Sequence, residues 1–133
     1  MKKKLLNACL VLAMCASPVL AKDLLVVLYG VDEVTLIDRD SIKRSGNMAG
    51  AWIVWSYETQ RPATDALPAY RSIRIRLAFD CSQQKIAVAE RRFYGRPFGR
   101  GNAVARENVD NPFTWKQPAS ATERTLLAMA CEG

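Results

Sequence analysis

The clearest pattern in the chain is an alternation of apolar and polar positions from Tyr70 to Cys81. The apolar positions are Ile73, Ile75, Leu77, Phe79 and Cys81, and Ser72, Arg74, Arg76, Ala78 and Asp80 lie between them. A period of two predicts a β-strand with one buried face and one largely polar face. Because Cys81 belongs to the apolar series, we expect its sulfur to face the core.

Five further segments predict strands of the same sheet. Met48–Tyr57 has apolar residues on both sides, which is typical of a central strand covered on both faces. Lys85–Tyr94 follows the alternating strand after a short polar link, so we expect the two to pair antiparallel. Its apolar positions change sides, and a bulge near Glu90 would explain the change. The remaining predicted strands are Leu24–Tyr29, Glu33–Asp38 and Gly101–Val109.

One helix is predicted, at the C-terminus and ending near Cys131. Ser120 and Glu123 have the spacing of a capping box, in which each side chain bonds an early backbone N–H group. Glu123, Leu127 and Cys131 fall in one i, i+4 row. That row would face the sheet and bring Cys131 to Cys81. The pattern predicts an α+β fold of about five or six antiparallel strands with one C-terminal helix on the inner face.

The first 21 residues have the order of a secretory signal. Lys2–Lys4 are basic, an apolar stretch follows, and Ala21 is a small residue at the expected cleavage site. We predict cleavage after Ala21 and one mature domain over residues 22–133. A membrane-spanning helix is the alternative, but it needs about 20 apolar residues, and Pro18 shortens this run.

A lipoprotein is a second alternative for the same segment. Leu12–Cys15 resembles a lipidation box with Cys15 as the acylated residue, but the residue before such a cysteine is normally small, and here it is Met14. Cys9 follows a small residue, but almost no apolar run precedes it. The sequence therefore disfavours lipidation at Cys15.

Removal of the signal would leave Cys81 and Cys131 as a pair. An oxidising compartment favours a disulfide between them. Closing a loop of this length stabilises a domain by about 4 kcal/mol in the chain-entropy model. Two free thiols or a redox pair are the alternatives, but a redox pair normally has the spacing Cys-x-x-Cys. Since the chain has no histidine, a zinc site would need four thiolates or added carboxylates, and we expect no metal.

The charge of the mature chain is modest. The whole chain has 19 basic and 13 acidic residues, and the signal removes three lysines and no acid, which leaves 16 and 13. A nucleic-acid-binding domain usually concentrates more charge than a net +3. Twelve of the 16 basic residues are arginines, and guanidinium groups suit carboxylates and sulfates.

Seven candidate ligand-binding residues lie on the predicted hairpin that follows Ile73 and on the loop Gly95–Gly101. They are Arg74, Arg76, Arg91, Arg92, Arg96, Phe98 and Arg100. Pairing of the two strands would gather several of these guanidinium groups, although a solvated sheet face is the alternative interpretation. We expect the glycine-rich loop to be a mobile basic turn. Trp52, Trp55 and Trp115 are expected in the core.

No catalytic group stands out. Without histidine there can be no Ser-His or Cys-His pair. The adjacent acids, Asp32 with Glu33 and Asp38 with Asp40, lie beside predicted turns and lack a supporting motif. We therefore expect no enzyme activity and no cofactor.

Several pieces of the chain, in order, resemble the surface-adhesin protein E family of Gram-negative bacteria. They are Ile37–Ile42, Trp52–Trp55, Tyr70–Ile73, Phe79–Cys81, Tyr94–Gly95, Trp115–Ser120 and Leu126–Cys131. The resemblance implies a curved sheet with the helix on its concave side, tied by the disulfide. It also implies attachment to host extracellular-matrix proteins.

The leading hypothesis is an exported, non-enzymatic binding protein of this type, in the periplasm or on the cell surface of a Gram-negative bacterium. It would bind a protein or an anionic polysaccharide through the arginines between Ile73 and Arg100. The alternative is a periplasmic inhibitor of a hydrolase such as lysozyme, which would insert the loop Gly95–Gly101 into the enzyme's cleft.

Overall fold

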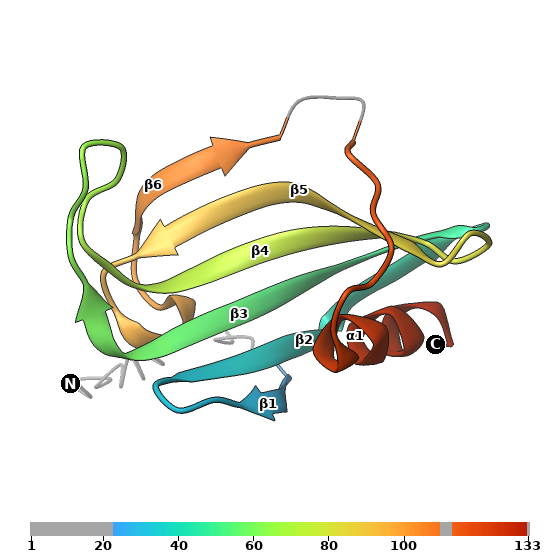
Figure 1. The fold of residues 1–133 in the computed structure, drawn as a ribbon, viewed down its shortest axis with the longest axis horizontal. Helices are drawn as coiled ribbons and strands as arrows, with labels where there is room; N and C mark the ends of the chain where they lie inside the picture. The colour runs from blue at the N-terminus through green and yellow to red at the C-terminus, as the bar shows by residue number, and fades with distance from the viewer. Residues whose placement is uncertain (1–22, 110–112, 133) are drawn as a thin grey trace, which may run out of the picture.

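A computed structural model of the chain describes residues 23–109 and 113–132. The predicted signal segment 1–21, its cleavage after Ala21 and lipidation at Cys15 lie outside the described residues. Six strands of the described chain form one antiparallel sheet in chain order (Figure 1). They are β1 (Leu24–Tyr29), β2 (Glu33–Ser45), β3 (Met48–Arg61), β4 (Tyr70–Asp80), β5 (Lys85–Tyr94) and β6 (Ala103–Asn108). A short 3-10 turn, η1 (Pro97–Gly99), follows β5, and the helix α1 (Ala121–Cys131) follows β6.

The register of the strands defines two faces. Ile37, Ile53 and Ile75 lie opposite one another on β2, β3 and β4, and they mark the inner face. The neighbouring row consists of Asp38, Trp52 and Arg76, and it marks the outer face. Ile53 and Val54 are both buried although they point to opposite sides, so β3 is the predicted central strand covered on both faces.

The hydrophobic core lies between the inner face and α1. Leu126, Leu127 and Ala130 are buried against the inner-face residues, which include Ile37 and Phe79. The helix contacts strands β1 to β5, so the sheet curves around it and α1 lies on the concave face, in front of the sheet in Figure 1. This confirms the predicted fold class and the implied position of the helix.

The capping box of α1 is confirmed, with one difference. The Glu123 N–H donates to Ser120 Oγ at 3.1 Å, as predicted. The Glu123 carboxylate reaches back to the N–H of Ala119 at 2.8 Å, one residue before the cap. Its other oxygen accepts from Lys116 Nζ at 2.9 Å. One early helix donor and the N–H before the cap are thus satisfied, and the start of the helix is joined to Lys116, whose backbone bridges to Ile86 of β5.

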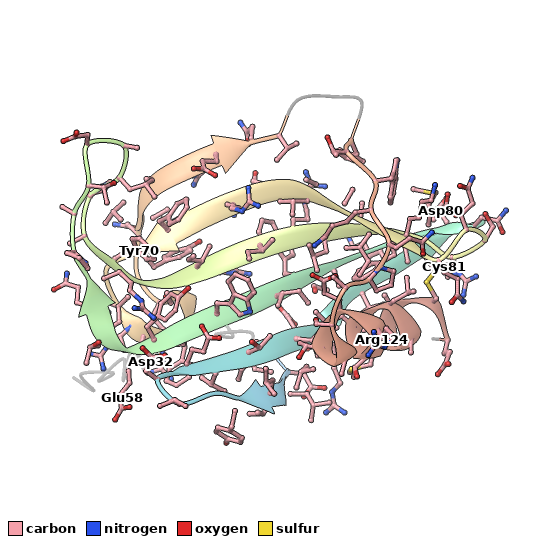
Figure 2. The ribbon with its side chains drawn as sticks, in the orientation of Figure 1. Asp32, Glu58, Tyr70, Asp80, Cys81 and Arg124 are labelled. Carbon is pink, nitrogen blue, oxygen red and sulfur yellow. A yellow bond between two sulfur atoms is a disulfide. The ribbon has the colours of Figure 1, made fainter. Side chains whose placement is uncertain are left out.

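The disulfide between Cys81 and Cys131 is present, and the two Cα atoms lie 5.6 Å apart. Figure 2 shows Cys81 at one end of β4 beside the last turn of α1, with Tyr70 at the opposite end of the same strand. The bond therefore joins the C-terminal end of the helix to one end of the sheet, as the sequence predicts.

The structure corrects several predicted boundaries. β2 and β3 run on to Ser45 and Arg61, well beyond the predicted ends, and β6 is shorter than Gly101–Val109. The bulge in β5 is confirmed, because the register with β4 shifts between Val88 and Glu90. The extensions were missed because they are polar and do not alternate.

The prediction that the three tryptophans lie in the core is wrong. Trp55 is 38% exposed, and Trp52 and Trp115 are half-buried. A helix of 11 residues is about 16 Å long, whereas the 14 residues of β3 extend over about 46 Å. The helix therefore leaves much of the inner face open around Trp55, and Trp52 points to the other face.

Candidate functional site

A row of arginines crosses three strands on the outer face. Arg74, Arg92 and Arg106 lie opposite one another on β4, β5 and β6, and Arg76 is the next outward residue of β4. We call these four residues the arginine row. Adjacent strands lie about 4.8 Å apart, so the guanidinium groups form a basic strip across the sheet. Arg106 was not among the predicted site residues, because only the pairing of β6 with β5 brings it there.

Trp52 lies beside this row and orients two of its members. The guanidinium carbons of Arg74 and Arg92 lie 5.2 Å and 4.6 Å from the centre of the Trp52 ring. Such cation–π contacts are favourable and restrict the long side chains. The prediction that strand pairing gathers guanidinium groups therefore fits Arg74, Arg76 and Arg92. The sequence analysis did not predict that the indole of Trp52 contacts two of them.

Glu90 balances part of this charge. Its carboxylate lies 2.7 Å from Arg92 Nε and accepts a longer hydrogen bond of 3.4 Å from the same guanidinium. The short contact has the distance of an ion pair but not the alignment of a hydrogen bond. The hydrogen bond with Glu90 raises the pKa of Arg92 above its ordinary value, so this guanidinium remains charged.

The loop after β5 is anchored to the outer face. Ser72 Oγ accepts from the N–H of Gly99 at 2.8 Å and donates to the carbonyl of Arg96 at 2.6 Å. Ser56 Oγ accepts from the N–H of Phe98 at 3.1 Å. Three hydrogen bonds to buried serines thus tie the loop to the sheet, and its mobility stays a prediction. Hydrolase inhibition by insertion of this loop stays a prediction.

The other predicted site residues lie apart from the arginine row. Arg91 points to the inner face and pairs with Glu107 at 3.5 Å. Arg96 and Arg100 lie on the anchored loop, and the Arg100 guanidinium lies 5.6 Å from the ring of Phe98. Phe98 itself is 39% exposed. The predicted set of seven is thus divided between a strip on the sheet, a loop and the opposite face.

A hollow of about 720 Å³ adjoins the arginine row. Its walls include Trp52, Arg76, Met48 and Phe113, and one side is formed by Asp38, Asp40, Ser41 and Lys43 of β2. Gly50 and Ala78, which lie opposite each other on β3 and β4, form its floor. Two small residues facing each other in long strands are the sequence signal that could have indicated this hollow.

The sequence profile described as surface-adhesin protein E matches residues 27–132. The chain belongs to the surface-adhesin protein E family. The matched region contains half of β1, the other five strands, α1, both bonded cysteines and the arginine row. The resemblance drawn from the sequence is therefore confirmed.

The structure comparison agrees with membership of the surface-adhesin protein E family. A crystal structure of protein E from non-typeable Haemophilus influenzae matches with a TM-score of 0.56 and 16% sequence identity, covering 82% of this chain and 72% of that chain. At this identity the likeness establishes the fold, and the function has to be argued from the site. No curated protein matches the chain. Across residues 23–109 and 113–132, no helix has the length and hydrophobicity needed to cross a bilayer.

Proposed function

We propose that this protein is an exported, non-enzymatic adhesin that binds an acidic partner, either a host matrix protein or an anionic polysaccharide, through the arginine row. One observation carries the proposal: Arg74, Arg92 and Arg106 are in register on the outer face, beside Arg76 and Trp52. The inner face is partly covered by α1, which leaves the outer face as the broad charged surface.

The chemistry of the row favours carboxylates and sulfates. Each guanidinium is a planar fork that donates two parallel hydrogen bonds to such groups. Arg74 and Arg92 are held against Trp52, so less side-chain entropy is lost when a ligand binds. Because Arg76 and Arg106 are exposed, binding should weaken as salt increases.

Membership of the surface-adhesin protein E family supports a role in attachment at the bacterial surface. The predicted signal segment supports export, and the disulfide suits an oxidising compartment. These features agree on compartment and on the general class of function.

The test is to replace Arg74, Arg76 and Arg106 by Gln and to measure binding to immobilised heparin and to basement-membrane extract. Removing three members of one strip should weaken binding at least tenfold. The matched control replaces Arg39, Arg61 and Arg124 by Gln, which removes the same charge from other surfaces, and it should change binding less than twofold. Equal losses in the two variants would show that only net charge matters and would contradict the proposal.

A further inference from the structure

The hollow beside the arginine row has a small residue, Gly50, in its floor, although neither close packing nor backbone conformation requires glycine there. A Cβ atom added to Gly50 would lie 3.6 Å from the carbonyl oxygen of Leu77, an ordinary contact distance, and Gly50 does not have a positive φ. The backbone would therefore accept a larger residue at this position. Small residues on the floor keep about 720 Å³ accessible, a volume within the usual range for ligand sites.

Three side chains of different chemistry lie in one row across the hollow. Asp38, Trp52 and Arg76 are directly opposite one another on β2, β3 and β4, and all three line the space. With strands about 4.8 Å apart, the backbone positions of the acid and the arginine are separated by about 10 Å. The site thus offers an acceptor, an aromatic surface and a cationic donor in order.

Asp38 has hydrogen-bonding capacity that the fold does not use. The residue is 6% exposed, and among the described residues its Oδ1 has no hydrogen-bond partner. Burying an unpaired carboxylate oxygen is unfavourable, and such groups in native proteins usually have a reason. A hydroxyl donor from a ligand would satisfy this side chain.

The lining of the hollow carries charges of both signs. Asp38, Asp40 and Lys43 of β2 share it with Arg76 of β4, so the formal charges cancel. This lining favours a ligand that presents hydroxyl donors, one acidic group and an apolar C–H surface for Trp52. A uronic-acid sugar has all three.

We propose that the hollow binds one uronate unit of an acidic polysaccharide whose chain continues along the arginine row. This inference rests on the proposed function and names its ligand. Asp38 accepts from a sugar hydroxyl, Arg76 donates to the uronate carboxylate, and the edge of Trp52 contacts the C–H face of the ring. Along β3, Trp52 lies between Gly50, which is in the floor of the hollow, and Val54, which pairs with Arg74. One polysaccharide chain can therefore contact both the hollow and the arginine row.

Ala78→Leu tests the inference because it fills the floor without changing charge. Ala66→Leu, in the exposed β3–β4 loop, is the matched control. The probes are a hyaluronan hexasaccharide, which has uronates without sulfate, a heparin hexasaccharide, which has both, and dextran sulfate, which has sulfate alone. Binding is measured by calorimetry with the disulfide-bonded protein. Ala78→Leu should weaken the binding of both hexasaccharides at least tenfold and the binding of dextran sulfate less than twofold. Ala66→Leu should leave the binding of all three probes unchanged.

Two further variants guard against a local disturbance of the strand. Gly50→Val fills the same floor from β3 and should reproduce the loss. Asp38→Asn keeps the volume, removes the charged acceptor and should weaken hyaluronan binding severalfold.

The outcomes separate the two proposals. The inference is overturned if Ala78→Leu and Gly50→Val both bind the hexasaccharides as the wild type does. It is also overturned if these variants lose binding to dextran sulfate as strongly as binding to the hexasaccharides. In either case the arginine row remains a general anion-binding strip. Wild-type binding to dextran sulfate but to neither hexasaccharide has the same meaning. If the wild type binds none of the three probes, an acidic polysaccharide is excluded as the ligand of both the hollow and the arginine row. Only an acidic protein would then remain as the partner of the arginine row.

Discussion

At the scale of single residues, the outer face depends on a few close contacts between the anchored loop and β4. Gly99 has φ +65, and a Cβ atom there would lie 2.6 Å from Cγ and Cδ of Arg74. Ser72, which is fully buried, holds the same glycine through its hydroxyl group. The loop backbone therefore lies directly against one member of the arginine row.

Replacing Gly99 by Ala should lower the free energy of unfolding by about 1–3 kcal/mol, because a residue with a side chain is strained at this φ. The added methyl group would also displace Arg74. Gly46→Ala is the control, since Gly46 has φ +59 but a Cβ atom added there would meet nothing within 4 Å. Urea titration should show the larger loss for Gly99→Ala, and equal losses would mean that the contact with Arg74 contributes nothing.

The individual site residues were only partly predictable. Arg74 and Arg76 could be placed on one face from the alternation of β4, and the bulge anticipated near Glu90 in β5 is what brings Arg92 to the same face. The same bulge turns Arg91 to the inner face, whereas the sequence analysis grouped Arg91 with the other candidate arginines. Trp52 could not be recognised as the partner of two arginines, since hydrophobicity alone favours burial of tryptophan.

At the scale of secondary-structure elements, the local signals in the sequence were reliable where side chains alternate or cap. The β4 alternation and the α1 capping box both gave boundaries within a residue of those observed. The continuation of β2 beyond Asp38 was missed, because residues such as Arg39 and Asp40 are polar and only the far end, Lys43–Ser45, is held by pairing with β3. Tertiary pairing, rather than local propensity, makes that segment a strand.

The turn between β4 and β5 shows how one carboxylate organises an element end. Asp80 Oδ1 accepts from the N–H groups of Gln83 and Ser82, both at 3.0 Å, and from the Ser82 hydroxyl at 2.8 Å. The hydrogen bond from the Gln83 backbone, followed by that from the Ser82 hydroxyl, lowers the pKa of Asp80 below its ordinary value. The ionised form therefore stabilises the turn.

This arrangement predicts a specific pH dependence. A carboxyl whose pKa is lower in the folded state contributes stability above its unfolded pKa, and this contribution is lost as the pH falls through the folded pKa. Stability of the wild type should therefore decline below about pH 4, and Asp80→Asn should reduce the slope of that decline. Asp65→Asn, an exposed acid in the β3–β4 loop, should leave the slope unchanged. A slope that is identical in Asp80→Asn and the wild type would contradict the assignment.

At the scale of the whole molecule, the two faces of the sheet have separate tasks. The inner face forms the core with a short helix, and the outer face carries the loop, the arginine row and the hollow. Six strands in chain order give a large open surface but few long-range connections other than strand pairing. The helix is the last described element to join the sheet, and one covalent bond holds its end there.

That bond should decide the stability of the domain. The disulfide between Cys81 and Cys131 closes a loop with a sequence separation of 50, which corresponds to about 4 kcal/mol of unfolded-state entropy. Because small domains are stable by only about 5–15 kcal/mol, replacing both cysteines by Ala should move the urea midpoint far toward zero. Dithiothreitol should destabilise the wild type by a similar amount and should not affect the double variant. If the double variant unfolds at the wild-type midpoint, the packing of Leu126, Leu127 and Ala130 alone holds the helix, and the covalent bond is dispensable for the fold.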